Sequence, residues 1–178
     1  MQEKFKLKNG QYVDIRKIKA SDYEDVMAYL AEFSQTVGAK FTYQYPGRPK
    51  ADKEKSIKAY EDENSLFLGG YDNGKLIAVS QIGFIKPDHP WCGKNASFGI
   101  SMLDKYQGQG LGFYLMQRME QWARQKGVHR IEDCVRQKNK KGIALYLKCG
   151  FEIEGLARGN AFIDGEWINT YYIAKILD

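Results

Sequence analysis

A glycine-rich stretch in the middle of the chain has the composition of an anion-binding turn. Glycines stand at positions 108, 110 and 112, between a strand-like apolar segment (96–103) and a segment with helical spacing (110–126). Glycines let the chain turn tightly and bring several backbone N–H groups toward one point. The start of the helix adds unpaired N–H groups and the positive end of the helix dipole. The stretch predicts a site for a phosphate or pyrophosphate; a glycine turn without a ligand is the alternative.

Two common phosphate-binding motifs do not fit this stretch. A P-loop requires Lys and then Ser or Thr directly after its last glycine, and neither follows Gly112. A dinucleotide-binding G-x-G-x-x-G motif would need a third glycine where Phe113 stands. The turn also comes late, after a predicted hairpin rather than in a first βαβ unit.

Two spaced motifs resemble those of the GNAT acetyltransferase superfamily. The first is similar to the family's Q/R-x-x-G-x-G/A signature, in Gln107, Gly110 and Gly112. The second follows the family's order in Asn139, Ala144, Tyr146, Gly150 and Phe151. The C-terminal part of the sequence resembles the branch of the family that includes ribosomal-protein and polyamine acetyltransferases. The residues that carry this likeness are Gly155, Arg158, Asp164 and Gly165. The resemblance covers most of residues 66–178.

The resemblance implies that the turn holds acetyl-CoA. In the family, backbone amides of this motif bind the pyrophosphate, and the pantetheine arm lies between two splayed strands. Backbone groups near Met102 and Leu103 would then face the acetyl and pantetheine amides. Asn139 would hydrogen-bond the arm, and it is also placed to cap the next helix. The expected cofactor-binding residues of the turn are Gln107, Gly108, Gln109, Gly110, Leu111 and Gly112.

Acetyl transfer to an amine needs one group that accepts a proton and one that protonates the departing thiolate. The resemblance makes Tyr146 the general acid, since a phenol pKa near ~10 is close to that of a thiol. By spacing alone, Tyr146 also fits a core aromatic on an amphipathic helix. The base is not identified: Glu132 and Asp133 are adjacent on one strand and face opposite sides. Asp104 fits a structural role at the turn, and a backbone carbonyl with ordered water stays open.

The amine acceptor is expected near the first two helices and the loop between them. Aromatic faces attract cations, and the candidate walls are Phe33, Phe41, Tyr43 and Tyr45. These aromatics would otherwise anchor the loop in the core. The acidic run 61–63 would attract a polyamine or form a solvated helix end. The sequence does not decide among a small amine, an amino acid, an aminoglycoside and a protein N-terminus.

Apolar periodicity and turn residues define the elements that position these groups. They predict about seven strands, at 11–18, 66–68, 76–85, 96–103, 128–135, 151–158 and 167–176. Helical spacing predicts four helices, at 22–35, 53–62, 110–126 and 140–148. Asn73-Gly74 predicts a tight hairpin turn. We therefore expect an α/β GNAT fold in one domain over residues 1–178, a mixed sheet of about seven strands with about four flanking helices.

Composition excludes several classes of protein. The 178 residues are 43% hydrophobic and 28% charged, which suits a globular domain with a core. No apolar run approaches the ~20 residues that span a bilayer, so no membrane partner is expected. No apolar segment follows the positively charged start, which indicates a cytoplasmic protein. The net charge of +5 comes from scattered basic residues, so no nucleic-acid partner is expected.

The cysteines predict neither a disulfide framework nor a metal site. Cys92, Cys134 and Cys149 are an odd, sparse set. His89 lies near Cys92, but two ligands make a poor metal site, so no metal is expected. Cys134 and Cys149 have no His nearby in the sequence, and no covalent enzyme intermediate is expected.

The combined features predict an acetyl-CoA-dependent N-acetyltransferase that acetylates a primary amine of a small molecule or peptide by direct transfer. The alternative is a non-catalytic acyl-CoA-binding or sensor module on the same fold, since no base is evident. Homodimers are common in the family, and the tyrosine-rich final strand would take part in one by analogy.

Overall fold

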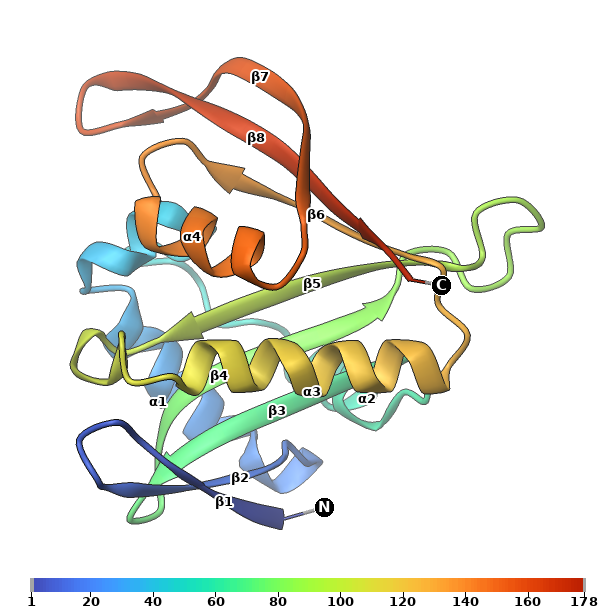
Figure 1. Cartoon of the computed structure of the whole chain (residues 1–178). Helices are drawn as coiled ribbons and strands as arrows, with labels where there is room; N and C mark the ends of the chain where they lie inside the picture. Colours follow the sequence, from blue (N-terminus) through green and yellow to red (C-terminus); the bar gives the residue numbers. More distant parts are fainter. Residues whose placement is uncertain (1, 178) are drawn as a thin grey trace.

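The computed structural model describes residues 2–177 and shows a mixed eight-stranded sheet in the order β1-β2-β3-β4-β5-β6-β8-β7 (Figure 1). The strands are β1 (Gln2–Lys6), β2 (Tyr12–Lys17), β3 (Ser65–Asp72), β4 (Lys75–Phe84), β5 (Asn95–Met102), β6 (Arg130–Arg136), β7 (Glu152–Ile163) and β8 (Glu166–Ile176). The helices are α1 (Tyr23–Phe33), α2 (Lys53–Glu61), α3 (Leu111–Gln125) and α4 (Lys140–Lys148), with short 3₁₀ turns η1 (Ala20–Asp22), η2 (Val37–Phe41) and η3 (Asp104–Tyr106). The predicted α/β architecture, a mixed sheet with four flanking helices, is confirmed, with one strand more than the expected seven.

The additional strand is β1, which pairs antiparallel with β2 at the edge of the sheet. Its residues alternate with lysine at positions 4 and 6, a composition that protects edge strands from pairing with other chains. Phe5 packs against Tyr114 of α3, with ring centroids 4.6 Å apart. A strand with a single large apolar residue has no clear period in its sequence, so periodicity alone does not reveal it.

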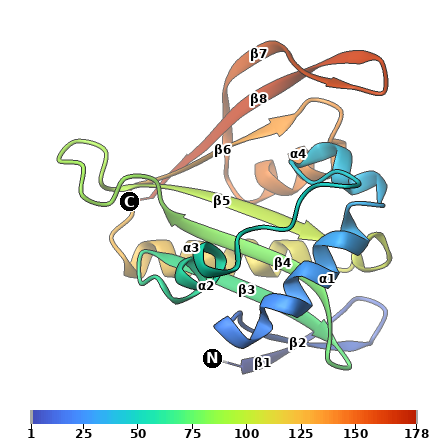
Figure 2. The same ribbon diagram turned by 180° about the vertical axis from the view of Figure 1, so that it is seen from behind.

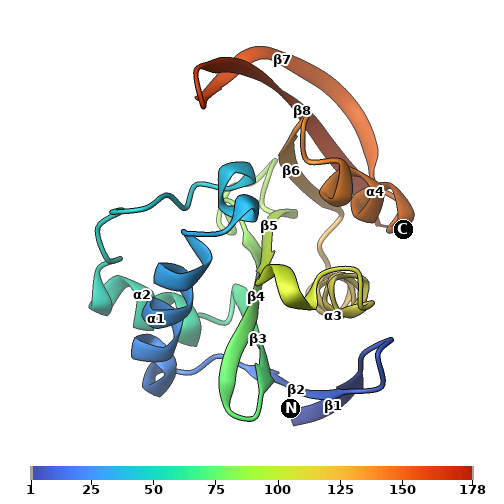
Figure 3. The ribbon, with the colours of Figure 1, turned by 90° about the vertical axis from the view of Figure 1, so that its left-hand side faces the viewer.

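The helices lie on both faces of the sheet. The helices α1 and α2 cover one face, and α3 and α4 cover the other (Figures 2 and 3). Leu111, Leu115 and Met119 form a buried stripe along α3, as the helical spacing predicts. The stripe connects two apolar clusters, because Leu111 and Leu115 belong to the first and Met119 to the second.

The strands β5 and β6 separate along their length. They pair in parallel from Asn95–Ser97 to Arg130–Glu132, and the described chain has no further pair between them. The strand β5 continues to Met102 along β4, while β6 follows β8 to its end. In Figure 1 the two strands diverge toward the start of α3. Backbone groups on the facing edges therefore lack a partner strand beyond Ser97, as the splayed pair implied by the resemblance requires.

Candidate active site

The glycine turn connects the end of β5 to the start of α3. Gly108 and Gly110 have φ of +73° and +91°, a region that non-glycine residues rarely adopt. A Cβ at Gly108 would meet nothing within 4 Å, so the backbone conformation rather than space calls for glycine. Gly110 precedes α3 and gives its first turn no side-chain cap, and this turn contains no acidic residue. The first N–H groups of α3 are therefore available to an anion.

Gln107 holds the turn against its neighbours. Its Nε2 donates to the Met102 carbonyl at 3.3 Å and to Asp104 Oδ1 at 2.9 Å. Lys141 of α4 donates from Nζ to Gln107 Oε1 at 3.1 Å. Asp104 is thus engaged within the turn, in line with the structural role expected of it. Lys141 adds a positive charge beside the uncapped helix start, which favours a phosphate there.

The remaining residues of the turn have different surroundings. Gln109 faces the β1–β2 hairpin, where its carbonyl accepts from Lys8 N at 3.2 Å and its Oε1 from Asn9 N at 3.2 Å. Leu111 is fully buried, so it can offer a ligand its backbone alone. A Cβ at Gly112 would lie 3.3 Å from Leu145 Cδ2, so the close approach of α3 and α4 leaves little space for a side chain at this position.

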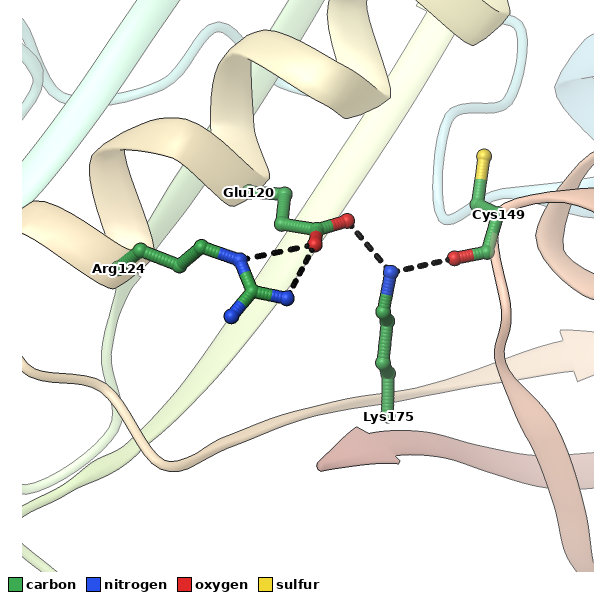
Figure 4. Close-up of polar contacts among 4 residues, drawn as sticks. All are labelled: Glu120, Arg124, Cys149 and Lys175. Atoms are coloured by element: carbon green, nitrogen blue, oxygen red, sulfur yellow. Dashed lines mark hydrogen bonds and ion pairs between the residues drawn. The ribbon is translucent and has the colours of Figure 1, made fainter. Parts of the chain in front are cut away.

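The helix α4 is fixed at both ends. Asn139 Oδ1 accepts from Gly142 N at 2.9 Å, which confirms the N-cap expected from the sequence. At the other end Lys175 Nζ donates to the Cys149 carbonyl at 2.7 Å and to Glu120 Oε2 at 2.6 Å (Figure 4). Arg124 also contacts Glu120, at 2.8 Å. These contacts join α4, the helix that carries Tyr146, to α3 and β8.

The ring of Tyr146 packs among aromatic side chains and also lines a cavity. Its centroid lies 5.2 Å from that of Phe98 and 6.1 Å from that of Phe151. Burial raises the pKa of the Tyr146 phenol, so it stays protonated at neutral pH. The two interpretations of Tyr146 in the sequence, core aromatic and proton donor, are therefore compatible in space.

A cavity of about 770 Å³ lies between the sheet and the α1–α2 segment. It is lined by α1, α2 and the loop joining them, and it also reaches Phe98, Asp133 and Tyr146 where β5 and β6 separate. Of the expected wall aromatics, Phe41 and Tyr43 line the cavity. The other two expected wall residues, Phe33 and Tyr45, do not line the cavity. The acidic run does not line it either, at Glu61, Asp62 or Glu63. Phe33 instead stacks on Tyr29 in the core.

The two adjacent carboxylates of β6 have different surroundings. Glu132 forms an ion pair with Arg130, whereas Asp133 lines the cavity. Burial raises the pKa of Asp133 to about 6, although the N–H groups of Cys134 and Phe98 stabilise its ionised form. Asp133 therefore combines access to the cavity with a pKa suited to accepting a proton near neutral pH.

Two polar residues of the cavity wall carry no signal in the sequence. Arg136 of β6 and Thr170 of β8 are opposite each other in the β6–β8 ladder, and both line the cavity. They belong to no local motif, because β6 and β8 are separated by α4 and β7. The period of two along β6 puts Arg136 on the same face as Cys134, and this is the one local indication of its direction.

Comparisons with known proteins agree with this geometry. The acetyltransferase (GNAT) family matches residues 28–151. The chain belongs to this family. The predicted family and its enzyme class, acetyltransferase, are thereby confirmed. Among residues 2–177 no helix has the length and apolarity to cross a membrane.

Individual GNAT proteins are similar over different lengths. The L-amino acid N-acetyltransferase AaaT of Escherichia coli is 36% identical over 85 residues, 46% of this chain, and the match spans about half (51%) of that relative. The structure of a GNAT acetyltransferase from Streptococcus pneumoniae superposes with TM-score 0.83 at 24% identity, covering 93% of this chain and 99% of that one. Salmonella typhimurium yncA, solved with its cofactor acetyl-CoA, has TM-score 0.77 at 18% identity, with coverages of 93% and 94%. At these identities the two structures establish the shared fold.

Proposed function

We propose that this protein is an N-acetyltransferase that transfers an acetyl group directly from acetyl-CoA to a primary amine held in the cavity. One observation carries the proposal. A single cavity touches both the α1–α2 wall and, where β5 and β6 separate, the side chains of Asp133 and Tyr146. The uncapped start of α3 follows the end of β5 in the chain. An amine and a thioester can thus meet beside a proton acceptor and a proton donor.

The residues of the turn suit the pyrophosphate of acetyl-CoA. The backbone N–H groups of residues 108–112 and the Lys141 ammonium would bind the anion, with Gln107 holding the turn in shape. Asn139 would contact the pantetheine arm as well as cap α4. Gln109 and Leu111 would contribute through their backbones.

The register of β5 indicates which backbone groups face the arm. The Leu103 N–H donates to the Ile77 carbonyl of β4, so Leu103 faces β4. Successive residues of a strand direct their backbone groups to alternate sides. Ile100 and Met102 therefore face the opening toward β6, and we assign the contacts with the acetyl and pantetheine amides to them in preference to Leu103.

The proposed reaction forms a C–N bond and breaks a C–S bond. Asp133 accepts the proton that the amine loses, and Tyr146 donates the proton that the departing thiolate gains. A covalent acyl-cysteine is not needed. Burial and the charge of Asp133 raise the pKa of the Cys134 thiol, which keeps it in the weakly nucleophilic protonated form.

The cofactor site is tested at Gly108, where a side chain has free space. Asp and Asn both tolerate a positive φ, so the variants Gly108→Asp and Gly108→Asn place similar side chains at the turn and differ in charge. We expect isothermal titration with acetyl-CoA to show at least tenfold weaker binding for Gly108→Asp than for Gly108→Asn. Equal affinities in the two folded variants would contradict a pyrophosphate site at this turn.

Turnover separates the enzyme from a binding module on the same fold. The wild-type protein with acetyl-CoA should release free CoA in the presence of at least one member of a broad amine panel. Tight acetyl-CoA binding without release of CoA over the whole panel would instead support the non-catalytic acyl-CoA sensor.

A further inference from the structure

The cavity wall contains two buried polar atoms that lack a partner. Arg136 Nε and Thr170 Oγ1 are both inaccessible to solvent and have no hydrogen bond within the described chain. Their residues are directly opposite each other in the β6–β8 ladder, and both line the cavity. Buried donors are nearly always paired in folded proteins, so two neighbouring exceptions point to a missing ligand. A guanidinium N–H and a hydroxyl can both donate to one acceptor group.

Arg136 also has no acidic partner among the described residues. Arg136 takes part in none of the ion pairs of residues 2–177. Its contacts are the Tyr43 ring, 5.6 Å from the guanidinium carbon, and the Thr42 carbonyl at 3.4 Å. Arg48 is placed beside the same aromatic, since its Nη1 donates to the Tyr43 carbonyl at 2.7 Å. Two guanidinium groups thus lie near one part of the cavity wall.

Neither of the two acidic residues that line the cavity, Asp52 and Asp133, forms an ion pair with Arg136. Asp52 caps α2 by accepting from Lys55 N at 2.8 Å, and Lys55 itself adds a third cation to the lining. Asp133 lies at the other part of the cavity, beside Phe98 and Tyr146. The acidic run 61–63 does not line the cavity. A polyamine would therefore meet more positive than negative charge along this wall.

We propose that the acceptor is an amino acid, whose carboxylate binds Arg136 and Thr170 while its amine faces Asp133; this rests on the proposed N-acetyltransferase function. The planar guanidinium matches the two oxygens of a carboxylate, and the hydroxyl supplies one further donor. Arg136 and Asp133 are three residues apart on β6, about 10 Å along the strand, and their side chains leave opposite faces of it. Both nevertheless line the one cavity, because β5 and β6 separate at Asp133 and open the sheet there.

The rest of the wall indicates the side chain of that amino acid. Five apolar residues line the cavity, namely Val26, Met27 and Leu30 of α1 and Val79 and Ile100 of the sheet. Apolar walls favour an apolar ligand group and give little to a charged one. The acceptor class is thus an amino acid with an apolar side chain, such as leucine or phenylalanine.

Matched pairs of amine substrates test this class. Leucine and phenylalanine are compared with their primary amides, which keep the amine and the side chain but lack the carboxylate, and with spermidine. We expect kcat/KM for each free acid to exceed that for its amide and for spermidine at least tenfold. The amide has the less basic amine, so its larger deprotonated fraction works against the expected preference.

Variants of the wall locate the preference. Arg136→Gln should lower kcat/KM for leucine at least tenfold and leave that for leucinamide within about twofold, because the amide has no charge to lose. Thr170→Val keeps the shape of the side chain and should lower kcat/KM for leucine by a smaller factor than Arg136→Gln does. Acetyl-CoA affinity serves as the control and should be the same in all three proteins.

The two proposals fail in different ways. If amides or spermidine are acetylated as well as the free acids, the carboxylate site is wrong and the acetyltransferase stands. If no amine is acetylated, the proposed function is wrong. The carboxylate site is then still tested by titrating leucine and leucinamide into the CoA-bound protein. Equal binding of leucine and leucinamide would overturn the proposed carboxylate site.

Discussion

At the scale of single residues, the hydrogen bonds and the pKa of Asp133 follow from its position just beyond the last paired residues of β5 and β6. Ser97 and Glu132 form the last pair between β5 and β6, and Phe98 and Asp133 follow them. The Asp133 carboxylate accepts from the Cys134 N–H at 2.6 Å and from the Phe98 N–H. It therefore spans the point where the strands begin to separate. Burial there raises its pKa to about 6, so it is mostly ionised at neutral pH yet still a useful base.

The role of Asp133 predicts a pH dependence. We expect kcat/KM to rise as the pH increases through about 6, because the ionised carboxylate is the form that accepts a proton. Asp133→Asn should abolish the rise of kcat/KM near pH 6 and lower kcat/KM about 10²–10⁴-fold. Initial rates from pH 5 to 9 measure both effects. A pH limb that persists in Asp133→Asn would show that another group is the base.

The stability of the same variant has an expected sign. The folded pKa of Asp133 is raised above its usual value of 3.8, so ionisation is less favourable in the fold than in the unfolded chain. The fold therefore loses stability as the pH rises between the two pKa values. Asp133→Asn, which cannot ionise, should be no less stable than wild type at pH 8.

Tyr146→Phe is the matched control for the pH profile of kcat/KM. This variant should lower kcat, keep the rise in kcat/KM near pH 6 and leave the affinity for acetyl-CoA unchanged.

At the scale of elements, α4 depends on its ends as well as on three partly buried side chains that pack against the core, Ile143, Leu145 and Tyr146. It is nine residues long, and none of its residues falls in the buried class. Isolated helices of this length are unstable in water. Asn139 caps its start, and Lys175 of β8 bonds the carbonyl of Cys149 just beyond its end. The position of Tyr146 thus depends in part on a strand that is remote in sequence.

Removal of the lysine contact should loosen α4. Lys175→Met deletes charged hydrogen bonds to Cys149 and to the partly buried Glu120, and we expect a loss of about 1–3 kcal/mol in the free energy of unfolding. Lys140→Met, an exposed lysine at the start of the same helix, is the control and should change stability by less than about 0.5 kcal/mol. Urea unfolding measures both. Equal, small losses would show that Lys175 does not hold the helix.

At the scale of the whole molecule, two apolar clusters are joined through α3 while β5 and β6 separate beside it. The first cluster holds α1, the early strands and the start of α3, and the second holds β5, β6, β8 and the rest of α3. The proposed position of acetyl-CoA lies between the separated strands. The cofactor would therefore add contacts between parts of the sheet that the backbone ladder does not connect.

This position predicts a thermal shift. At about 100 times its dissociation constant, a ligand of the folded state adds about 2.7 kcal/mol of stability. For a chain of this size that corresponds to an increase of about 5–10 °C in the unfolding midpoint. Scanning calorimetry with and without acetyl-CoA measures it. The Gly108→Asp variant should show a much smaller shift at the same concentration, and an equal shift would place the cofactor elsewhere.

Much of the local structure follows from the sequence alone. The predicted helix at 140–148 coincides with α4, and the hairpin at Asn73-Gly74 forms with φ of 47° and 83°. The glycine turn likewise precedes α3 as expected. These features depend on side-chain period, caps and backbone freedom, which act between neighbours in the chain. The one missed strand, β1, is stabilised mainly by its pairing with β2, a contact that its own five residues do not encode.

The chemistry of the cavity was decided by tertiary structure. Alternation along β6 puts Glu132 and Asp133 on opposite faces, but it does not say which face meets the cavity. That depends on where β5 and β6 stop pairing and on the ion pair that engages Glu132. Arg136 and Thr170 meet because β8 returns along β6 after α4 and β7. Sequence patterns report local periodicity, whereas a cavity is built from residues distant in the chain, whose proximity and burial exist in the folded molecule alone.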